Sequence, residues 1–205
     1  MGKTLGKWVR KSNVNFAQIF LQVQGVLETL PEGLKDHVNR TRCLAKELAS
    51  IHEIDILKCE LAAAAHDIYR HWSKLSLLKE SVKESIQVDD IEASEPILLH
   101  GSLASNWLKK YANCDDIHVL NAVRYHTTGR PVMSAVEKVV FLADKVEPGK
   151  VSREEDLSKI RDLAYVNLDK AIEKYLGWRI CRIVSEGGLI HPLSIDTWNS
   201  LKRQF

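Results

Sequence analysis

The sequence has few cysteines, little net charge and no long apolar run. Its cysteines are Cys43, Cys59, Cys114 and Cys181. No two of them have the spacing of a metal-binding knuckle, and nothing suggests a secreted disulfide framework. The net charge of +2 is too small to suggest a nucleic-acid or membrane binder. No apolar run has the length of a membrane span, and residues 14–27 do not resemble a signal peptide. We therefore expect a cytoplasmic protein with reduced thiols and with neither nucleic acid nor a membrane as partner.

What the sequence does contain is apolar residues at helical spacing along almost its whole length. No credible run of strands appears. With 205 residues, 45% of them hydrophobic, the chain is long enough to bury one full core. We predict an all-α helical bundle forming a single domain over residues 1–205. A basic N-terminal segment, about 1–30, is expected to pack on this domain or to extend from it; its cations are Lys3, Lys7, Arg10 and Lys11.

Capping residues, prolines and glycines predict where the helices begin and end. In the first half we expect helices over about 13–29, from about Asp36, from an N-cap at Asp55, and around 75–86. A loop is expected at Asp89–Glu95, and then a helix from Pro96 to about 112. In the second half we expect helices from a cap at Asp115 or Asp116, from a capping box of Ser134 and Glu137, from a second box of Ser152 and Glu155, over about 167–186, and after His191-Pro192.

One stretch, residues 61–70, predicts a functional centre. It reads Leu-Ala-Ala-Ala-Ala-His-Asp-Ile-Tyr-Arg, which is typical of a buried helix that carries a histidine and an aspartate into the interior. There His66 and Asp67 need polar partners or a metal ion. Helical spacing also places His37 on the core-facing side of its helix. Taken alone, each histidine is best interpreted as a hydrogen-bonded core residue.

Together, however, six such residues favour a metal site, because they are too many buried ionisable groups for an ordinary core. Nitrogen and oxygen ligands without thiolate suit iron, manganese or zinc, and do not suit calcium or magnesium. Asp67 has two oxygens and could bridge two metals while His66 serves only one. The six candidate ligands are His37, His66, Asp67, His100, His126 and Asp144.

Two arginines near these ligands predict an anionic substrate. Arg130 lies in a turn-rich loop after His126, and Arg70 lies one turn past Asp67. The alternative for both is an ion pair at the protein surface. Thr127 and Thr128 either donate hydroxyls to phosphate or cap the helix end. The five tryptophans, Trp8, Trp72, Trp107, Trp178 and Trp198, are too scattered for a base-stacking platform, so we expect them in core or interface packing.

The candidate ligands occur in the order seen in a known family. The chain resembles the HD-domain metal-dependent phosphohydrolases, and more finely the YqeK-type symmetrical bis(5'-nucleosyl)-tetraphosphatases, from about residue 34 to 199. The most specific match is the run His-Thr-Thr-Gly-Arg-Pro at 126–131. Other similar stretches are Leu98-Leu99-His100-Gly101, Leu142-Ala143-Asp144 with Glu147-Pro148, Arg161-Asp162-Leu163-Ala164 followed by Leu168-Asp169, and Ile190-His191-Pro192.

This resemblance implies a dinuclear metal enzyme that cuts diadenosine tetraphosphate into two ADP. It implies two divalent ions, with iron suggested. One ion would be held by His37, His66, Asp67 and Asp144. The other would be held by His100 and His126, with Asp67 bridging. The catalytic residues would be Asp67, Arg70 and Arg130; the substrate-binding residues would be Arg70, Thr127, Thr128, Arg130 and Lys150.

Two positions depart from the family pattern. Arg70 stands where the family usually has lysine, and Lys150 stands where it usually has arginine. Both changes keep the charge and alter the geometry of the donors. Two other functions remain open at this point: a di-iron oxygenase on the same fold, and a nucleotide-binding regulatory module without turnover. The cations Arg70, Arg130 and Lys150 favour a phosphorylated substrate, and the complete ligand set favours an enzyme. The sequence allows a homodimer without predicting one.

Overall fold

The protein is built from α-helices. The computed structural model describes residues 12–203, and over this range it contains twelve α-helices, one 3₁₀ turn and no strand. The predicted all-α class is therefore confirmed. One buried hydrophobic cluster extends from Ile19 in the first helix to Leu201 in the last. The predicted basic residues Lys3, Lys7, Arg10 and Lys11 lie outside the described residues.

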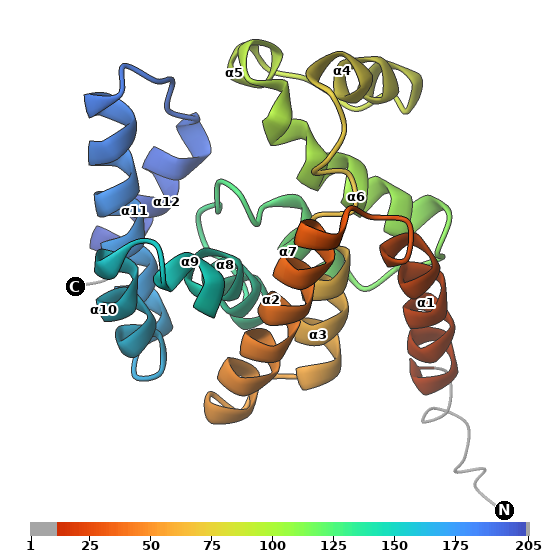
Figure 1. Ribbon diagram of the computed structural model, residues 1–205, viewed down its shortest axis with the longest axis horizontal. Coiled ribbons are helices and arrows are strands. Elements are labelled where there is room, and N and C mark those ends of the chain that lie inside the picture. The colour runs from red at the N-terminus through yellow and green to blue at the C-terminus, as the bar shows by residue number, and fades with distance from the viewer. Residues whose placement is uncertain (1–11, 204–205) are drawn as a thin grey trace, which may run out of the picture.

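Four helices form the centre of the molecule: α2 (Glu32–Ile51), α3 (Ile56–Ala65), α7 (Ile117–Arg124) and α8 (Ala135–Val146). Helix α2 packs on α3 and α8, and α7 contacts α3 and α8 (Figure 1). Nine of the twelve residues of α8 are buried. In α3 the buried residues include a run of four alanines, whose small side chains let the neighbouring helices approach closely.

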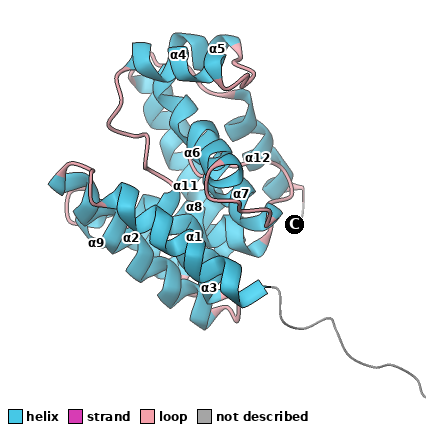
Figure 2. Ribbon diagram, turned by 90° about the vertical axis from the view of Figure 1, so that its right-hand side faces the viewer, coloured by secondary structure: helices cyan, strands magenta, loops and turns pink. Residues whose placement is uncertain are grey.

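One arm of the structure lies on one side of this centre. It contains α4 (Lys74–Lys83), α5 (Asp90–Ser94) and the 3₁₀ turn η1 (Pro96–Leu98), which leads into α6 (Leu99–Lys110). Helix α4 packs on η1 and α6, and α4 and α5 lie together at one end of the molecule (Figure 2). Leu77, Leu99 and Leu103 form a small second core there. Helix α1 (Ser12–Leu27) contacts α3.

The C-terminal helices form the opposite side, in teal and blue in Figure 1. They are α9 (Pro148–Val151), α10 (Glu155–Ala164), α11 (Leu168–Ser185) and α12 (Pro192–Lys202). Helix α11 packs on α8 and is contacted by α10 and α12. No helix among residues 12–203 combines the length and the hydropathy needed to cross a membrane.

Several predicted helix starts are confirmed by their capping contacts. Asp55 accepts a hydrogen bond from the backbone N–H of Lys58 at 3.1 Å. Asp116 caps α7, and Ser134 forms the predicted capping box with Glu137 at the start of α8. These starts are predictable because the capping bond joins residues only two or three positions apart.

Three predictions about the helices are wrong: one helix start, one segment expected as a loop and one capping box. Helix α2 begins at Glu32, directly after Pro31, and not at Asp36. The segment expected as a loop contains α5, which begins with a capping box of Asp89 and Glu92.

The box predicted for Ser152 and Glu155 does not form. Pro148 starts the short helix α9, and the hydroxyl of Ser152 donates to the carbonyl of Gly149 at the end of that helix. Helix α10 then begins at Glu155 without a side-chain cap.

Candidate metal centre

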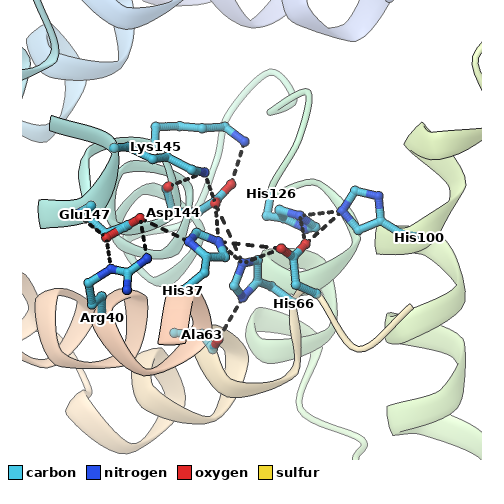
Figure 3. A network of polar contacts seen from close by, with 12 residues as sticks. His37, Arg40, Ala63, His66, His100, His126, Asp144, Lys145 and Glu147 are labelled. Atoms are coloured by element: carbon cyan, nitrogen blue, oxygen red, sulfur yellow. Dashed lines mark hydrogen bonds and ion pairs between the residues drawn. The ribbon is translucent and has the colours of Figure 1, made fainter. Parts of the chain in front are cut away.

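The six predicted ligands lie together in the interior, although they come from five different parts of the chain. All are buried except His37, whose side chain is 12% exposed. Figure 3 shows the four imidazoles and Asp144 directed toward one another. His37 lies on α2, His100 on α6 and Asp144 on α8. His66 and Asp67 directly follow α3, and His126 lies two residues after the end of α7.

Two groups can be separated within this cluster by their distances. In the first, the Nε2 atoms of His37 and His66 are 3.3 Å apart. Oδ1 of Asp144 lies 3.1 Å from Nε2 of His37 and 3.7 Å from Nε2 of His66. Oδ2 of Asp67 lies 3.5 Å from each of these two nitrogens.

In the second group, the Nε2 atoms of His100 and His126 are 2.9 Å apart. The other oxygen of Asp67, Oδ1, lies 3.1 Å from the first and 3.5 Å from the second. The two oxygens of Asp67 therefore face different pairs of histidines, which is the arrangement a bridging carboxylate requires.

Hydrogen bonds at the opposite ring nitrogens fix the orientation of these imidazoles. Nδ1–H of His66 donates to the carbonyl of Ala63, and Nδ1–H of His126 donates to that of Val123, each at 2.7 Å. Nδ1–H of His100 donates to the carbonyl of Ile97. A carbonyl can only accept, so Nδ1 carries a hydrogen in each of these rings, and Nε2 is the atom that faces the centre as a candidate metal ligand.

His37 is oriented by a side chain instead. Its Nδ1 lies 3.3 Å from Oε1 of Glu147, a residue only 1% exposed. Glu147 also accepts from Nε of Arg40 at 2.5 Å and from the backbone N–H of Gly149 at 2.6 Å. Burial opposes the charge on Glu147, but the hydrogen bonds from Arg40, Gly149 and His37 together outweigh it and lower the pKa of this carboxyl.

Two lysines contact the carboxylate of Asp144. Nζ of Lys145 lies 2.6 Å from Oδ2 of Asp144, and Nζ of Lys150 lies 2.6 Å from Oδ1. Burial opposes ionisation of Asp144, but these two positive charges, together with the hydrogen bonds from His37 and His66, outweigh it and hold its pKa well below the usual range. Burial lowers the pKa of His126 to about 3, which keeps this ring neutral. The centre thus combines ionised carboxylates with a neutral imidazole.

The donor set fits a divalent metal. Four imidazole nitrogens and the oxygens of two carboxylates face one another as acceptors, and they need cations between them. Three overlapping groups of these residues each offer ligand atoms within 4.8 Å of one another: His37–His66–Asp67, His66–His126–Asp144 and Asp67–His100–His126. No thiolate takes part, which suits iron, manganese or zinc.

A cavity of about 630 Å³ opens onto this centre. Asp67, His100, His126 and Asp144 line it on one side. The arm of α4–α6 and the C-terminal helices provide the other walls. Four of the predicted substrate-binding residues line the cavity: Arg70, Thr127, Thr128 and Lys150.

Arg130 is not among the residues that line this cavity. Its guanidinium makes two hydrogen bonds to Glu137, from Nε at 2.6 Å and from Nη2 at 2.8 Å. The carboxylate of Glu137 is 2% exposed, so this pair ties the loop after α7 to the first turn of α8. The alternative of an ion pair, left open from the sequence, is what the structure contains.

The two threonines take different positions. Thr127 is partly exposed, while Thr128 is buried and its hydroxyl donates to the carbonyl of Gly129. The ammonium group of Lys150 donates to both the backbone carbonyl and the carboxylate of Asp144. Arg70 is exposed, and its side chain has no ion pair or hydrogen bond within the described part of the chain.

Sequence reasoning missed several residues of the site. Arg153, exposed and also without a side-chain partner among residues 12–203, lines the cavity, as does Lys145. Arg40 and Glu147 are separated by 107 residues, so no local pattern could pair them. A signal for Lys145 was present, since it directly follows Asp144.

His191 was predicted only to begin the last helix, and this is confirmed, since its Nδ1 accepts from the backbone N–H of Leu193. In addition, its Nε2 lies 3.0 Å from Oδ2 of Asp89, the N-cap residue of α5. Because His191 also lines the cavity, this contact joins the arm to the C-terminal helices beside the site.

The chain is similar to known proteins over most of its length. The HD domain family matches residues 34–149. The symmetrical bis(5'-nucleosyl)-tetraphosphatase of Halalkalibacterium halodurans is 33% identical over 157 residues, which is 77% of this chain and 82% of that protein. The protein of the same name from Staphylococcus aureus is 32% identical over 174 residues, covering 84% of this chain and 88% of the relative.

A solved structure agrees with these matches. The crystal structure of a predicted HD superfamily hydrolase involved in NAD metabolism, from Clostridium acetobutylicum, is 28% identical to this chain. It superposes with a TM-score of 0.83 over 98% of this chain and 100% of that one.

Proposed function

The chain belongs to the HD domain family, among the symmetrical bis(5'-nucleosyl)-tetraphosphatases, and from this we propose that it hydrolyses diadenosine tetraphosphate into two ADP. The names of these relatives favour a phosphohydrolase over an oxygenase or a regulatory module. The single observation that carries the proposal is the placement of the Asp67 carboxylate. Its two oxygens face separate pairs of histidines, beside a cavity that is also lined by lysine and arginine side chains.

We propose two divalent ions in this centre, with iron as the metal and manganese and zinc as alternatives for the same donors. His37, His66, Asp67 and Asp144 would hold one ion; His100, His126 and the bridging Asp67 would hold the other. Such a pair lowers the pKa of a water molecule and polarises a phosphoryl oxygen.

The cations of the cavity would bind the tetraphosphate. Arg70 lies in the turn after α3 and Arg153 in the turn after α9, and both guanidinium groups are available for phosphate oxygens. The hydroxyl of Thr127 is a further donor at the cavity wall. Binding on both sides of the central phosphates would hold the chain so that the middle anhydride bond lies at the metal centre, which accounts for symmetrical cleavage.

Lys145 and Lys150 have a different role, because their ammonium groups contact Asp144. We propose that they keep this carboxylate ionised and oriented toward the histidines. Arg40 and Glu147 hold His37 in the same way from the opposite side of its ring. A cytoplasmic location, one domain over the full chain and a nucleotide as the partner belong to the same proposal.

The test is anaerobic purification with metal analysis, followed by incubation with diadenosine tetraphosphate and identification of the products. Two ADP per substrate are expected; ATP with AMP, or no cleavage, would contradict the proposal. Asp67→Asn should lose most of the metal and lower turnover by at least about 100-fold, because it removes the negative charge of a ligand that both ions would share. The matched control is Asp196→Asn on the exposed surface of α12, which should retain both.

The assignment of ligands to two ions is tested separately. His100→Ala should reduce the metal content by about one ion per chain while the first group stays partly occupied. An equal loss of both ions in this variant would show that the division into two groups is wrong.

A further inference from the structure

One part of the cavity is lined by apolar side chains, which lie among the charged residues Glu154, Arg179 and Glu186. The other charged residues of the cavity come mainly from the neighbourhood of α3, α8 and α9. Its apolar residues come mainly from α10, α11 and the loop after α11, namely Leu157, Tyr175, Trp178, Ile183 and Leu189. A nucleotide has the same two-part character, with an anionic phosphate chain and a flat base whose faces are apolar.

Trp178 is the more exposed of the two aromatic rings in this part of the cavity. Tyr175 also lines the cavity, but it is only 8% exposed, whereas Trp178 is partly buried. The two rings pack with centroids 5.8 Å apart and planes inclined at 45°. The sequence suggested core or interface packing for all tryptophans, because helical spacing cannot distinguish a core position from a cavity wall.

A network of charged residues holds the Trp178 ring in place. The guanidinium of Arg182 lies over the ring, 5.5 Å from its centroid. Arg182 in turn donates to Glu154 at 2.6 Å and to Glu186 at 2.9 Å. These contacts link α11 to the start of α10 and stabilise the cavity wall around the tryptophan.

We propose that the part of the cavity around Trp178 is a nucleobase subsite, in which one base of the substrate packs against the indole ring. This inference rests on the proposed function and assigns Trp178 a role in binding the substrate. With phosphates at Arg70 and Arg153 and the base at Trp178, a nucleoside diphosphate unit would extend from the metal centre to α11. Because every base has a flat π-face, an indole platform of this kind binds bases with little sequence preference.

The chain offers a matched control in Trp198. It is also partly buried against the main core, and a cation, Lys202, also lies 5.5 Å from its ring centroid. Trp198 is on α12 and is not among the residues that line the cavity. Removing either ring changes core packing, but only removal of Trp178 should change nucleotide binding.

The experiment measures binding of ADP and of pyrophosphate to the metal-loaded protein by calorimetry, in the wild type, Trp178→Ala, Trp178→Phe and Trp198→Ala. Trp178→Ala should weaken ADP binding by about 5- to 150-fold, the range for loss of one stacked base. Pyrophosphate binding should stay the same, since it has no base. Trp178→Phe should recover most of the ADP affinity, and Trp198→Ala should bind both ligands like the wild type.

Thermal unfolding of each variant guards against a general loss of structure, and Trp178→Leu, which keeps apolar volume without an aromatic face, replaces Trp178→Ala if that variant does not fold. Equal weakening of ADP and pyrophosphate, or full ADP affinity in the alanine and leucine variants, would overturn the subsite. Failure of the wild type to cleave diadenosine tetraphosphate would instead reject the proposed function, while the comparison of ADP with pyrophosphate would still decide the role of Trp178.

Discussion

Replacing Arg130 by alanine is expected to lower the free energy of unfolding and to leave turnover close to that of the wild type. The structure places this guanidinium against the carboxylate of Glu137 and not in the cavity. The resemblance to known phosphohydrolases implied a contact with substrate, so the two roles predict opposite results for the same variant.

The magnitude follows from burial. Glu137 is 2% exposed, and without Arg130 its carboxylate would keep, among the described residues, only the backbone N–H of Ser134, at 3.0 Å, as donor. Breaking a fully buried ion pair costs about 3–5 kcal/mol. The side chain of Arg130 is 30% exposed, so water would compensate part of this loss, and we expect a cost of about 1–3 kcal/mol. Arg130→Lys should lose less, because one charged bond can remain.

Urea unfolding gives the free energy, and the same preparations are assayed for metal content and for cleavage of diadenosine tetraphosphate. Arg124→Ala is the matched control. Its guanidinium lies over the same Tyr125 ring at 5.5 Å and makes no ion pair within residues 12–203. A double-mutant cycle with Glu137→Gln isolates the pair. If Arg130→Ala unfolds at the wild-type urea concentration but loses 30-fold or more in kcat/KM, about 2 kcal/mol in the transition state, the structural role is refuted.

Two further predictions concern stability away from the centre. Val132 has a φ of 57° and is 79% exposed, so Val132→Asn should stabilise the fold by about 1 kcal/mol in urea unfolding, because asparagine tolerates this backbone region. Val166→Asn, equally exposed at 78% without a positive φ, should have little effect, and a gain no larger than in this control would contradict the reasoning. Bonds from Lys110, Tyr111 and Asn106 lower the pKa of Glu84 from 4.5 to about 2. The stabilisation contributed by the Glu84 carboxylate should therefore be complete above about pH 4.5 and be lost as the pH falls toward 2. The difference in unfolding free energy between the wild type and Glu84→Gln should shrink over that range. A difference that does not depend on pH would show that the charge of Glu84 does not contribute to stability.

Local signals in the sequence predicted most of the fold. Asp55, Asp116 and Ser134 mark helix starts because each cap bonds to a residue two or three positions ahead. Asp89 has the same local signal, but a five-residue helix is too short for apolar periodicity to reveal it. Ser152 has the signal without the cap, because its hydroxyl is already bonded at the end of α9.

The centre was predictable for a different reason from its surroundings. Helical spacing alone places His37 and His66 on buried faces, so their meeting required only that the helices pack together. The contact between Arg40 and Glu147 depends on how α2 lies against the end of α8, over a separation of 107 residues. The same applies to Arg130, whose two possible roles are distinguished only by its tertiary contacts.

The way in which the histidines are oriented limits where the centre can be altered. Three of the four rings are held by the carbonyl three residues earlier in the chain, a group that no substitution can remove. His37 differs, since its ring is held by the side chain of Glu147. A change at Glu147, for example to glutamine, would modify the basicity of one ligand while all six ligands remain in place. In the proposed two-ion centre, a substitution at Glu147 would therefore adjust the affinity for one ion independently of the other.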